Sequence, residues 1–227
     1  MWLRMLLMTG LVATSMGAND DGCAREGDGP DRAATELGAD GDVATAGETG
    51  NVGVIPAEVA TDLAYLREEE KLARDVYDFL GAKWGLPIFG NIASSERTHT
   101  ARVATRMAEL GLPDPVVDDT GGAFVDTSLA ELYAALTARG AASLEAALQV
   151  GATIEDLDIQ DIAMKRTRTD DPATLAVYDD LMCGSRNHLR AFVGQLTSRG
   201  AAYSAQYLSQ AEVDAIVLSA KERCGGG

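Results

Sequence analysis

Large apolar side chains recur at alternating steps of four and three residues along most of the chain beyond residue 56. This spacing puts them on one face of an α-helix and is typical of the seam of a helix bundle. Four long helices are predicted on this basis, over about 56–84, 88–110, 143–168 and 172–200. No segment shows the two-residue alternation of a half-buried β-strand, so the fold class is predicted to be all-α.

Proline and glycine residues support these helix ends. Pro56 and Pro172 stand at expected first turns, where a missing backbone N–H costs nothing. Gly85, Gly111 and Gly200 follow the last apolar positions of three of the helices, where helices commonly stop.

The connection over 112–142 is long for two antiparallel neighbours and carries a short helical segment near 129–138. A connection of this length suits a crossover that runs along a four-helix bundle. A short amphipathic C-terminal helix is predicted over 209–221, and residues 222–227 are expected to form a frayed tail.

The N-terminal part of the chain has a different composition. Residues 1–18 combine a short positive start, an apolar run and small residues, which predicts an export signal. Residues 19–53 contain nine acidic residues, many glycines and almost no large apolar side chain, so we expect a disordered acidic linker. The bundle domain is then expected over 54–221, in the periplasm, on the cell surface or outside the cell.

Other interpretations of the N-terminus stay open. The first residues could follow a misassigned start codon or form a membrane anchor, although the apolar run is short for a membrane span. A lipid attached to Cys23 is less favoured, because Asn19, Asp20, Asp21 and Gly22 are not the small apolar residues that usually precede such a cysteine.

Charge narrows the range of partners. The formal net charge is −16, which argues against nucleic acids and anionic membranes and favours a protein that attracts cations. Apolar residues make up 46% of the chain, so a sizeable core can be buried. We therefore expect metal ions as partners, no nucleic acid and no membrane beyond the export signal; a homodimer is compatible with the sequence.

The three cysteines are Cys23, Cys183 and Cys224. Cys183 lies within a helical pattern and is predicted to be a buried thiol. Cys23 and Cys224 lie in the two tails and could pair if the chain is exported. No Cys-x-x-Cys pair occurs, which excludes a rubredoxin-like or zinc-ribbon site.

Metal-competent side chains interrupt every predicted apolar seam. They are, in chain order, Glu70, Glu96, His99, Glu155 and His188. A buried carboxylate without a partner costs several kcal/mol, and lysine and arginine do not occupy the seams in matching number. The two histidines are the only ones in the chain, and both fall on seams. A central cation would explain this pattern.

Glu96 and His99 are three residues apart and therefore share one helix face. In this Glu-x-x-His spacing the carboxylate can bridge two metals while the imidazole binds one of them. Carboxylate oxygens with imidazole nitrogens suit iron, and two ions are expected, with manganese or zinc as alternatives.

Four stretches carry a resemblance to a known family. EEEKLARDVY resembles the first helix of rubrerythrin-like proteins, with Glu70, Ala73, Arg74 and Tyr77 at matching positions. The stretches that resemble the other three ligand helices are SSERTHTARV, GATIEDLDIQDI and GSRNHLRAF. In this order they resemble the ferritin-like family labelled DUF2202, over about residues 57–200.

This resemblance implies a ferritin-like four-helix bundle with a di-iron site, in which Tyr77 supports a ligand carboxylate from outside. The family at large also has a carboxylate three residues before the histidine of the fourth helix, where this chain has Ser185. Asp158 could substitute for it; otherwise one metal would lack a ligand or the site would hold a single ion.

Other polar residues near the seams have plainer interpretations. Four of them are expected to face solvent: Glu68, Glu69, Asp156 and Asp161. Tyr77 is either a hydrogen-bond partner of a ligand or an ordinary core residue. Arg186 and Asn187 either brace the site or cap the bundle.

Three functions are compatible with the sequence. The first is an oxidoreductase, either a ferroxidase or a protein that reduces oxygen or peroxide with an external electron donor. The second is a metal-binding module without turnover, for iron capture. The third is a structural bundle that has lost its metal, in which Arg74 or Arg102 neutralises the seam carboxylates.

Overall fold

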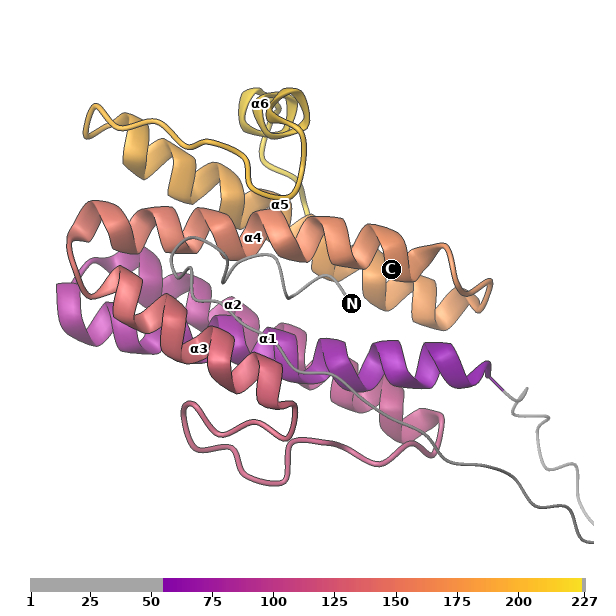
Figure 1. Ribbon diagram of the computed structural model, residues 1–227. Helices are drawn as coiled ribbons and strands as arrows, with labels where there is room; N and C mark the ends of the chain where they lie inside the picture. Colours follow the sequence, from indigo (N-terminus) through magenta and orange to yellow (C-terminus); the bar gives the residue numbers. More distant parts are fainter. Residues whose placement is uncertain (1–54, 226–227) are drawn as a thin grey trace, which may run out of the picture. The chain divides into compact units, whose positions relative to one another are not determined.

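The computed structural model describes residues 55–225, so the expected export signal and acidic linker lie outside the described residues. The all-α prediction is confirmed, since the described residues form helices and no strand. The helices are α1 (Ala57–Trp84), α2 (Pro87–Glu109), α3 (Thr127–Gly140), α4 (Leu144–Arg166), α5 (Pro172–Thr197) and α6 (Gln210–Leu218) (Figure 1).

Local sequence explains several helix ends. Gly85 ends α1 in a left-handed conformation with φ of 64°, and its N–H bonds the carbonyl of Gly81. The side chains of Ser143 and Asp171 cap the starts of α4 and α5 by accepting backbone N–H groups of the first turn. These caps set the starts of the two helices at Leu144 and Pro172, close to the predicted starts at about 143 and 172.

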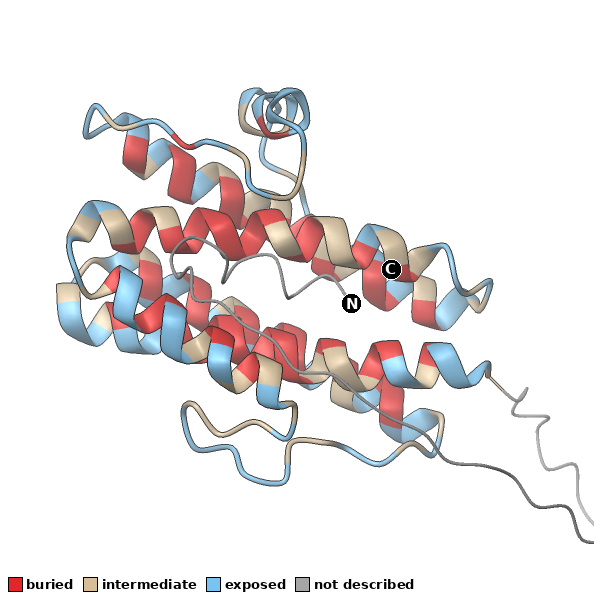
Figure 2. Cartoon of the chain, in the orientation of Figure 1, coloured by how far each residue is buried: buried red, intermediate tan, exposed pale blue. Residues whose placement is uncertain are grey.

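The four long helices form a bundle. α1 packs along α2, α4 packs along α5, and contacts of α2 with α5 and of α1 with α4 close it, while α3 lies against α1 and α4. The buried faces meet along the bundle interior (Figure 2). One cluster of the core consists of Val59, Leu63, Leu66, Val103, Met107, Ile162, Val177, Tyr178 and Leu181. None of the described helices combines the length and apolarity that a membrane span needs.

The predicted crossover over 112–142 connects α2 to α4 and includes α3; its first part is bound to α1 by ion pairs. Arg67 on α1 pairs with Asp114 at 3.1 Å, and Arg74 pairs with Asp119 at 2.7 Å. Arg74 therefore binds the crossover and does not neutralise the bundle seam.

Glu68 corrects one expectation, because it is buried and does not face solvent. Its carboxylate accepts the backbone N–H groups of Val125 at 2.6 Å and Asp126 at 3.0 Å, just before α3. The sequence pattern missed this role because α1 is covered by the crossover on the side where a simple bundle would meet water.

Asp156 was also expected to point outward, and this expectation is wrong: the residue is 0% exposed. Its carboxylate accepts the hydroxyl of Tyr203 at 2.7 Å and the backbone N–H groups of Gln206 at 2.6 Å and Leu208 at 2.8 Å. The segment that follows α5 folds back onto α4 around this one buried acid.

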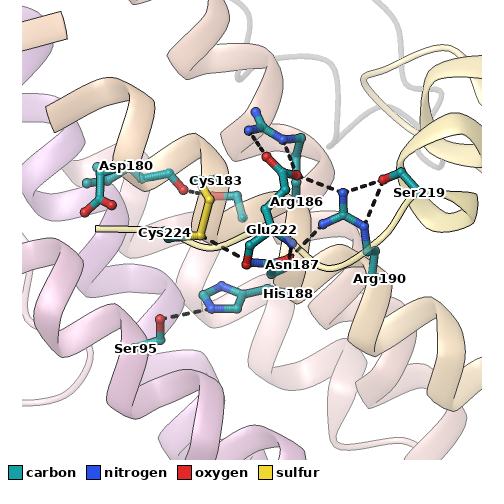
Figure 3. The surroundings of a disulfide bond; sticks show 12 residues. Ser95, Asp180, Cys183, Arg186, Asn187, His188, Arg190, Ser219, Glu222 and Cys224 are labelled. Carbon is teal, nitrogen blue, oxygen red and sulfur yellow. Dashed lines mark hydrogen bonds and ion pairs between the residues drawn. A yellow bond between two sulfur atoms is a disulfide. The ribbon is translucent and has the colours of Figure 1, made fainter. Parts of the chain in front are cut away.

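The cysteines differ from the prediction as well. Cys183 is not a free thiol: it forms a disulfide with Cys224, 41 residues further along the chain, while Cys23 lies outside the described residues. The tail is bound at this point rather than frayed, and Glu222 pairs with Arg186 and Arg190 (Figure 3). Sequence alone does not reveal this pair because it depends on the return of the tail to α5.

Replacing Asp156 with alanine should destabilise the fold by roughly 3 kcal/mol, because several buried donors would lose their acceptor. Urea denaturation measures the change. The control is Asp214→Ala on the exposed side of α6, which should stay within about 0.5 kcal/mol of the parent protein. Equal effects of the two substitutions would show that Asp156 does not anchor the C-terminal segment.

Candidate metal centre

The five seam residues with metal-competent groups lie together in the bundle interior. They are Glu70 on α1, Glu96 and His99 on α2, Glu155 on α4 and His188 on α5. All five are buried. The helical periodicity thus brings the predicted residues from four helices to one place.

The first group of three contains Glu70, Glu96 and His99. The Nδ1 atom of His99 lies 2.8 Å from Oε2 of Glu96 and 3.2 Å from Oε2 of Glu70. One imidazole nitrogen and two carboxylate oxygens therefore converge on one point.

The second group contains Glu96, Glu155 and His188. The Nδ1 atom of His188 lies 2.8 Å from Oε1 of Glu96 and 3.4 Å from Oε2 of Glu155. Glu96 belongs to both groups and turns one oxygen toward each histidine. The two imidazole rings lie 5.6 Å apart between centroids, so the two groups are neighbours.

Several of these atoms have no hydrogen-bond partner among the described residues. They are Oε1 of Glu70, Oε1 of Glu96, Oε2 of Glu155 and Nδ1 of His188. His188 and Glu96 are close, but their atoms do not adopt hydrogen-bonding geometry. Each unsatisfied buried polar group costs about 1–3 kcal/mol, a cost that a bound cation would remove. The donor set, of oxygen and imidazole nitrogen, fits iron, manganese or zinc.

Burial and charge shift the pKa values of these groups in opposite directions. Burial raises the pKa of Glu70 to about 8. Burial also acts to raise the pKa of Glu96, but the adjacent His99 and His188 outweigh it and lower that pKa. Burial lowers the pKa of His188, but the carboxylates of Glu96 and Glu155 outweigh it and raise the pKa to about 10. The shifts of Glu96 and His188 have one physical cause, because each group favours the charged form of the other.

Asp158 and Ser185 are the two residues on which the missing fourth-helix carboxylate depends. Asp158 is buried near the cluster but belongs to neither group of three, and its Oδ1 atom has no hydrogen-bond partner in the described residues. Burial, and then the carboxylates of Glu69 and Glu70, raise its pKa well above the ordinary value. Ser185 donates its hydroxyl to the carbonyl of Leu181 at 3.1 Å.

Two hydrogen bonds support the cluster from outside. The Tyr77 hydroxyl donates to Oε1 of Glu155 at 2.5 Å, which agrees with the first of the two interpretations of this residue. The hydroxyl of Ser95 lies 3.0 Å from Nε2 of His188, which leaves Nδ1 to face the carboxylates. Sequence reasoning missed Ser95, although it lies four residues before His99 and therefore shares a helix face with it.

Gly184 is a second residue that the sequence analysis missed. A Cβ atom at this position would collide with the His99 ring, so only glycine lets α5 approach that imidazole. Gly194, ten residues further along α5, has open space where its Cβ atom would lie.

Glu69 was expected to face solvent and is instead buried. Its Oε2 atom lies 3.4 Å from Nζ of Lys165, which also bonds Asp161 at 2.9 Å. Asp161 is only partly exposed, with 19% of its side chain accessible. Arg102 pairs with Asp180 and does not reach the cluster.

A groove of about 890 Å³ connects both histidines with the surface between α2 and α5. Its lining includes Asn91, Ser95, Asn187 and Cys224 in addition to His99 and His188. Figure 3 shows His188 and Ser95 below the bound tail. Small molecules can therefore approach the cluster from its imidazole side.

The bundle and its buried carboxylate–imidazole cluster define an all-α protein with a candidate metal centre. Residues 60–220 match the family described as "Uncharacterized protein domain (DUF2202)", and the chain belongs to that family. The resemblance seen in the four ligand stretches is thereby confirmed for the family.

A relative and a solved structure extend this finding. The chain is 47% identical over 169 residues to the "Uncharacterized protein MJ0754" of Methanocaldococcus jannaschii, which covers 74% of this chain and 91% of that protein. It is also similar to the "Crystal structure of hypothetical protein MJ0754 from Methanococcus jannaschii DSM 2661", with a TM-score of 0.71 and 47% identity. That match covers 72% of this chain and 93% of the solved one.

Replacing Gly184 with alanine should destabilise the protein by about 1–3 kcal/mol, since the new methyl group would force the His99 ring to move. The matched control, Gly194→Ala, adds the same methyl group to α5 without a contact and should stabilise by up to about 1 kcal/mol. Chemical denaturation of both variants measures the difference. The close approach would be refuted if both alanines raised stability alike.

Proposed function

We propose that this chain is a ferritin-like protein that binds two metal ions, iron above all, and reacts with oxygen or peroxide. The observation that carries the proposal is the shared Glu96, with one oxygen in each of two buried groups of ligands. A carboxylate in this position can bridge two ions, each with its own histidine and a further glutamate.

Charge balance supports two ions. Glu70, Glu96, Glu155 and Asp158 are four buried carboxylates, and two neighbouring imidazoles can carry at most two compensating charges. Two divalent ions supply four positive charges and allow both histidines to be neutral ligands. Asp158 thus provides the charge that Ser185 cannot, and we include it as the sixth proposed ligand.

The architecture supports the ferritin-like assignment. The four long helices with a crossover after the second one, and a ligand from each helix, are the arrangement of ferritin-like carboxylate proteins. The resemblance to rubrerythrin-like ligand helices points to the same superfamily.

The chemistry of the site follows from its surroundings. Iron, when bound, would supply redox chemistry toward oxygen or peroxide. The chain itself orients Glu155 through Tyr77 and His188 through Ser95, as outer partners of metal ligands commonly do. The groove between α2 and α5 provides access for small oxidants, and an external donor supplies electrons overall.

A metal-binding module without turnover is the second candidate. It is favoured by Ser185, whose hydroxyl is engaged with its own helix and offers no fourth-helix carboxylate. A purely structural bundle is less favoured, because Arg74 and Arg102 pair with Asp119 and Asp180.

We also propose export, which the Cys183–Cys224 disulfide supports because such bonds persist in oxidising compartments.

Metal content of single variants tests the shared ligand. The full chain loaded anaerobically with ferrous iron should hold about two ions, in line with one ion per ligand group. Glu96→Gln should lose both ions, since a neutral amide keeps only one oxygen and can no longer offer a charged carboxylate oxygen to each group, whereas Glu70→Gln and Glu155→Gln should each weaken one. Elemental analysis after gel filtration gives the stoichiometry.

The matched control is Glu131→Gln on the exposed side of α3, which should keep full metal content. Stopped-flow absorbance after addition of oxygen or peroxide separates the two candidates. Oxidation of the bound iron supports the reactive site, and an unchanged absorbance supports the binding module. Absence of metal, with no rise in melting temperature on addition of iron, would refute both.

Metal affinity should rise with pH between about 6 and 8, by about tenfold per unit for each proton released, because metal and proton compete for the same ligands. The raised pKa of His188, about 10, makes it one source of these protons. Competition with a chromophoric chelator at three pH values measures the trend, and a pH-independent affinity would contradict it.

The metal-free protein should show the opposite trend. A histidine whose pKa is raised by folding stabilises the fold fully below its unfolded pKa, about 6.5, and this contribution is lost as pH approaches 10. Urea denaturation of chelator-treated protein should therefore give a larger free energy of unfolding at pH 6 than at pH 9.

A further inference from the structure

The disulfide stands beside the proposed metal centre. Cys224 lines the same groove as His99 and His188. Cys183 directly precedes Gly184, the residue against which the His99 ring packs. The sulfur pair and both imidazoles therefore share one region of α5 and its groove.

The tail that carries Cys224 is held by bonds other than the disulfide. The Glu222 carboxylate accepts hydrogen bonds from Nε of Arg186 at 2.8 Å and from Nη2 of Arg190 at 2.8 Å. Asn187 donates its amide to the carbonyl of Glu222 at 3.1 Å and accepts the backbone N–H of Glu222 at 2.9 Å. We call these contacts the Glu222 clamp (Figure 3).

The clamp has a consequence for the redox behaviour of the pair. Because it holds the tail against α5, the two thiols should stay near each other after reduction. Their effective concentration is then high, which favours the disulfide and makes the dithiol a good reductant.

The two sulfurs differ in access. Cys183 is 8% exposed, whereas Cys224 is exposed. An external thiol can therefore attack the sulfur of Cys224, with Cys183 as the leaving thiolate. Asn187 donates its amide to the Cys224 sulfur at 3.2 Å and would also stabilise a thiolate there.

We propose that Cys183 and Cys224 form a two-electron couple that supplies reducing equivalents for peroxide reduction at the neighbouring centre. This inference rests on the proposed function. In the reaction two S–H bonds break and one S–S bond forms, which releases two electrons and two protons. Hydrogen peroxide takes up both, its O–O bond breaks, and two water molecules form. An external dithiol, oxidised in turn to its disulfide, regenerates the pair.

The test follows the thiols as well as the peroxide. The full chain as Cys23→Ser, which removes the third thiol, is reduced with a phosphine, desalted and loaded anaerobically with ferrous iron. One equivalent of hydrogen peroxide is added, and free thiols are alkylated and counted by peptide mass spectrometry. We expect Cys183 and Cys224 to become a disulfide at least about tenfold faster than in the metal-free protein, since peroxide would react at the metal site.

The outcomes separate the two proposals. If peroxide oxidises the bound iron but leaves both thiols free, the disulfide has only a structural role and the inference is overturned. If the iron-loaded protein does not react with peroxide at all, the proposed function itself fails. Equal rates of thiol oxidation with and without iron would mean that peroxide attacks the sulfurs directly, which also overturns the inference.

A measurement without metal tests the clamp. In glutathione redox buffers, Glu222→Ala should lower the equilibrium constant for disulfide formation by about tenfold, because the tail would lose its independent attachment. The matched control is Asp214→Ala on the exposed side of α6, which takes no part in the clamp and should leave the constant unchanged. If Glu222→Ala also leaves it unchanged, the clamp does not hold the thiols together and the argument fails.

Discussion

The structure depends on one constraint: a carboxylate, Glu96, lies in the bundle interior between two histidines. A buried carboxylate with only one partner would destabilise this packing, because one partner does not offset the cost of its desolvation. Here both oxygens face an imidazole nitrogen, and glutamates from α1 and α4 complete the two groups. The registers of α1, α2, α4 and α5 must therefore agree, since a shift of one residue in any helix would turn a glutamate or histidine away from the cluster.

The supporting contacts follow from this requirement. Gly184 lets α5 approach α2 at the level of His99, and Tyr77 reaches from α1 to Glu155 on α4. Gly184 adds almost no apolar surface to the core, whereas Tyr77 also packs its ring against Phe192. Both fix where the polar groups lie, which matters more in a buried cluster than the area it removes from water.

Much of this arrangement could be predicted from the sequence. Apolar periodicity gave the four long helices to within a few residues, and the polar interruptions of the seams identified the five side chains that the structure brings together. The failures have a common cause. Glu68, Glu69 and Asp156 were judged as if each helix had one buried face, but the crossover and the C-terminal segment cover further faces. Periodicity within one helix carries no information about segments that return from elsewhere, and the Cys183–Cys224 pair was missed for the same reason.

The enclosure of α1 has a further consequence. Along residues 68–77 this helix is buried on every side, so the glutamate side of the cluster is walled off. The groove between α2 and α5 instead opens on the imidazoles. This groove therefore reaches the cluster from its imidazole side. If the proposed ions bind here, they would pass the two imidazoles on their way in or out, and a chelator too bulky for the groove would remove them only as fast as the bundle itself opens.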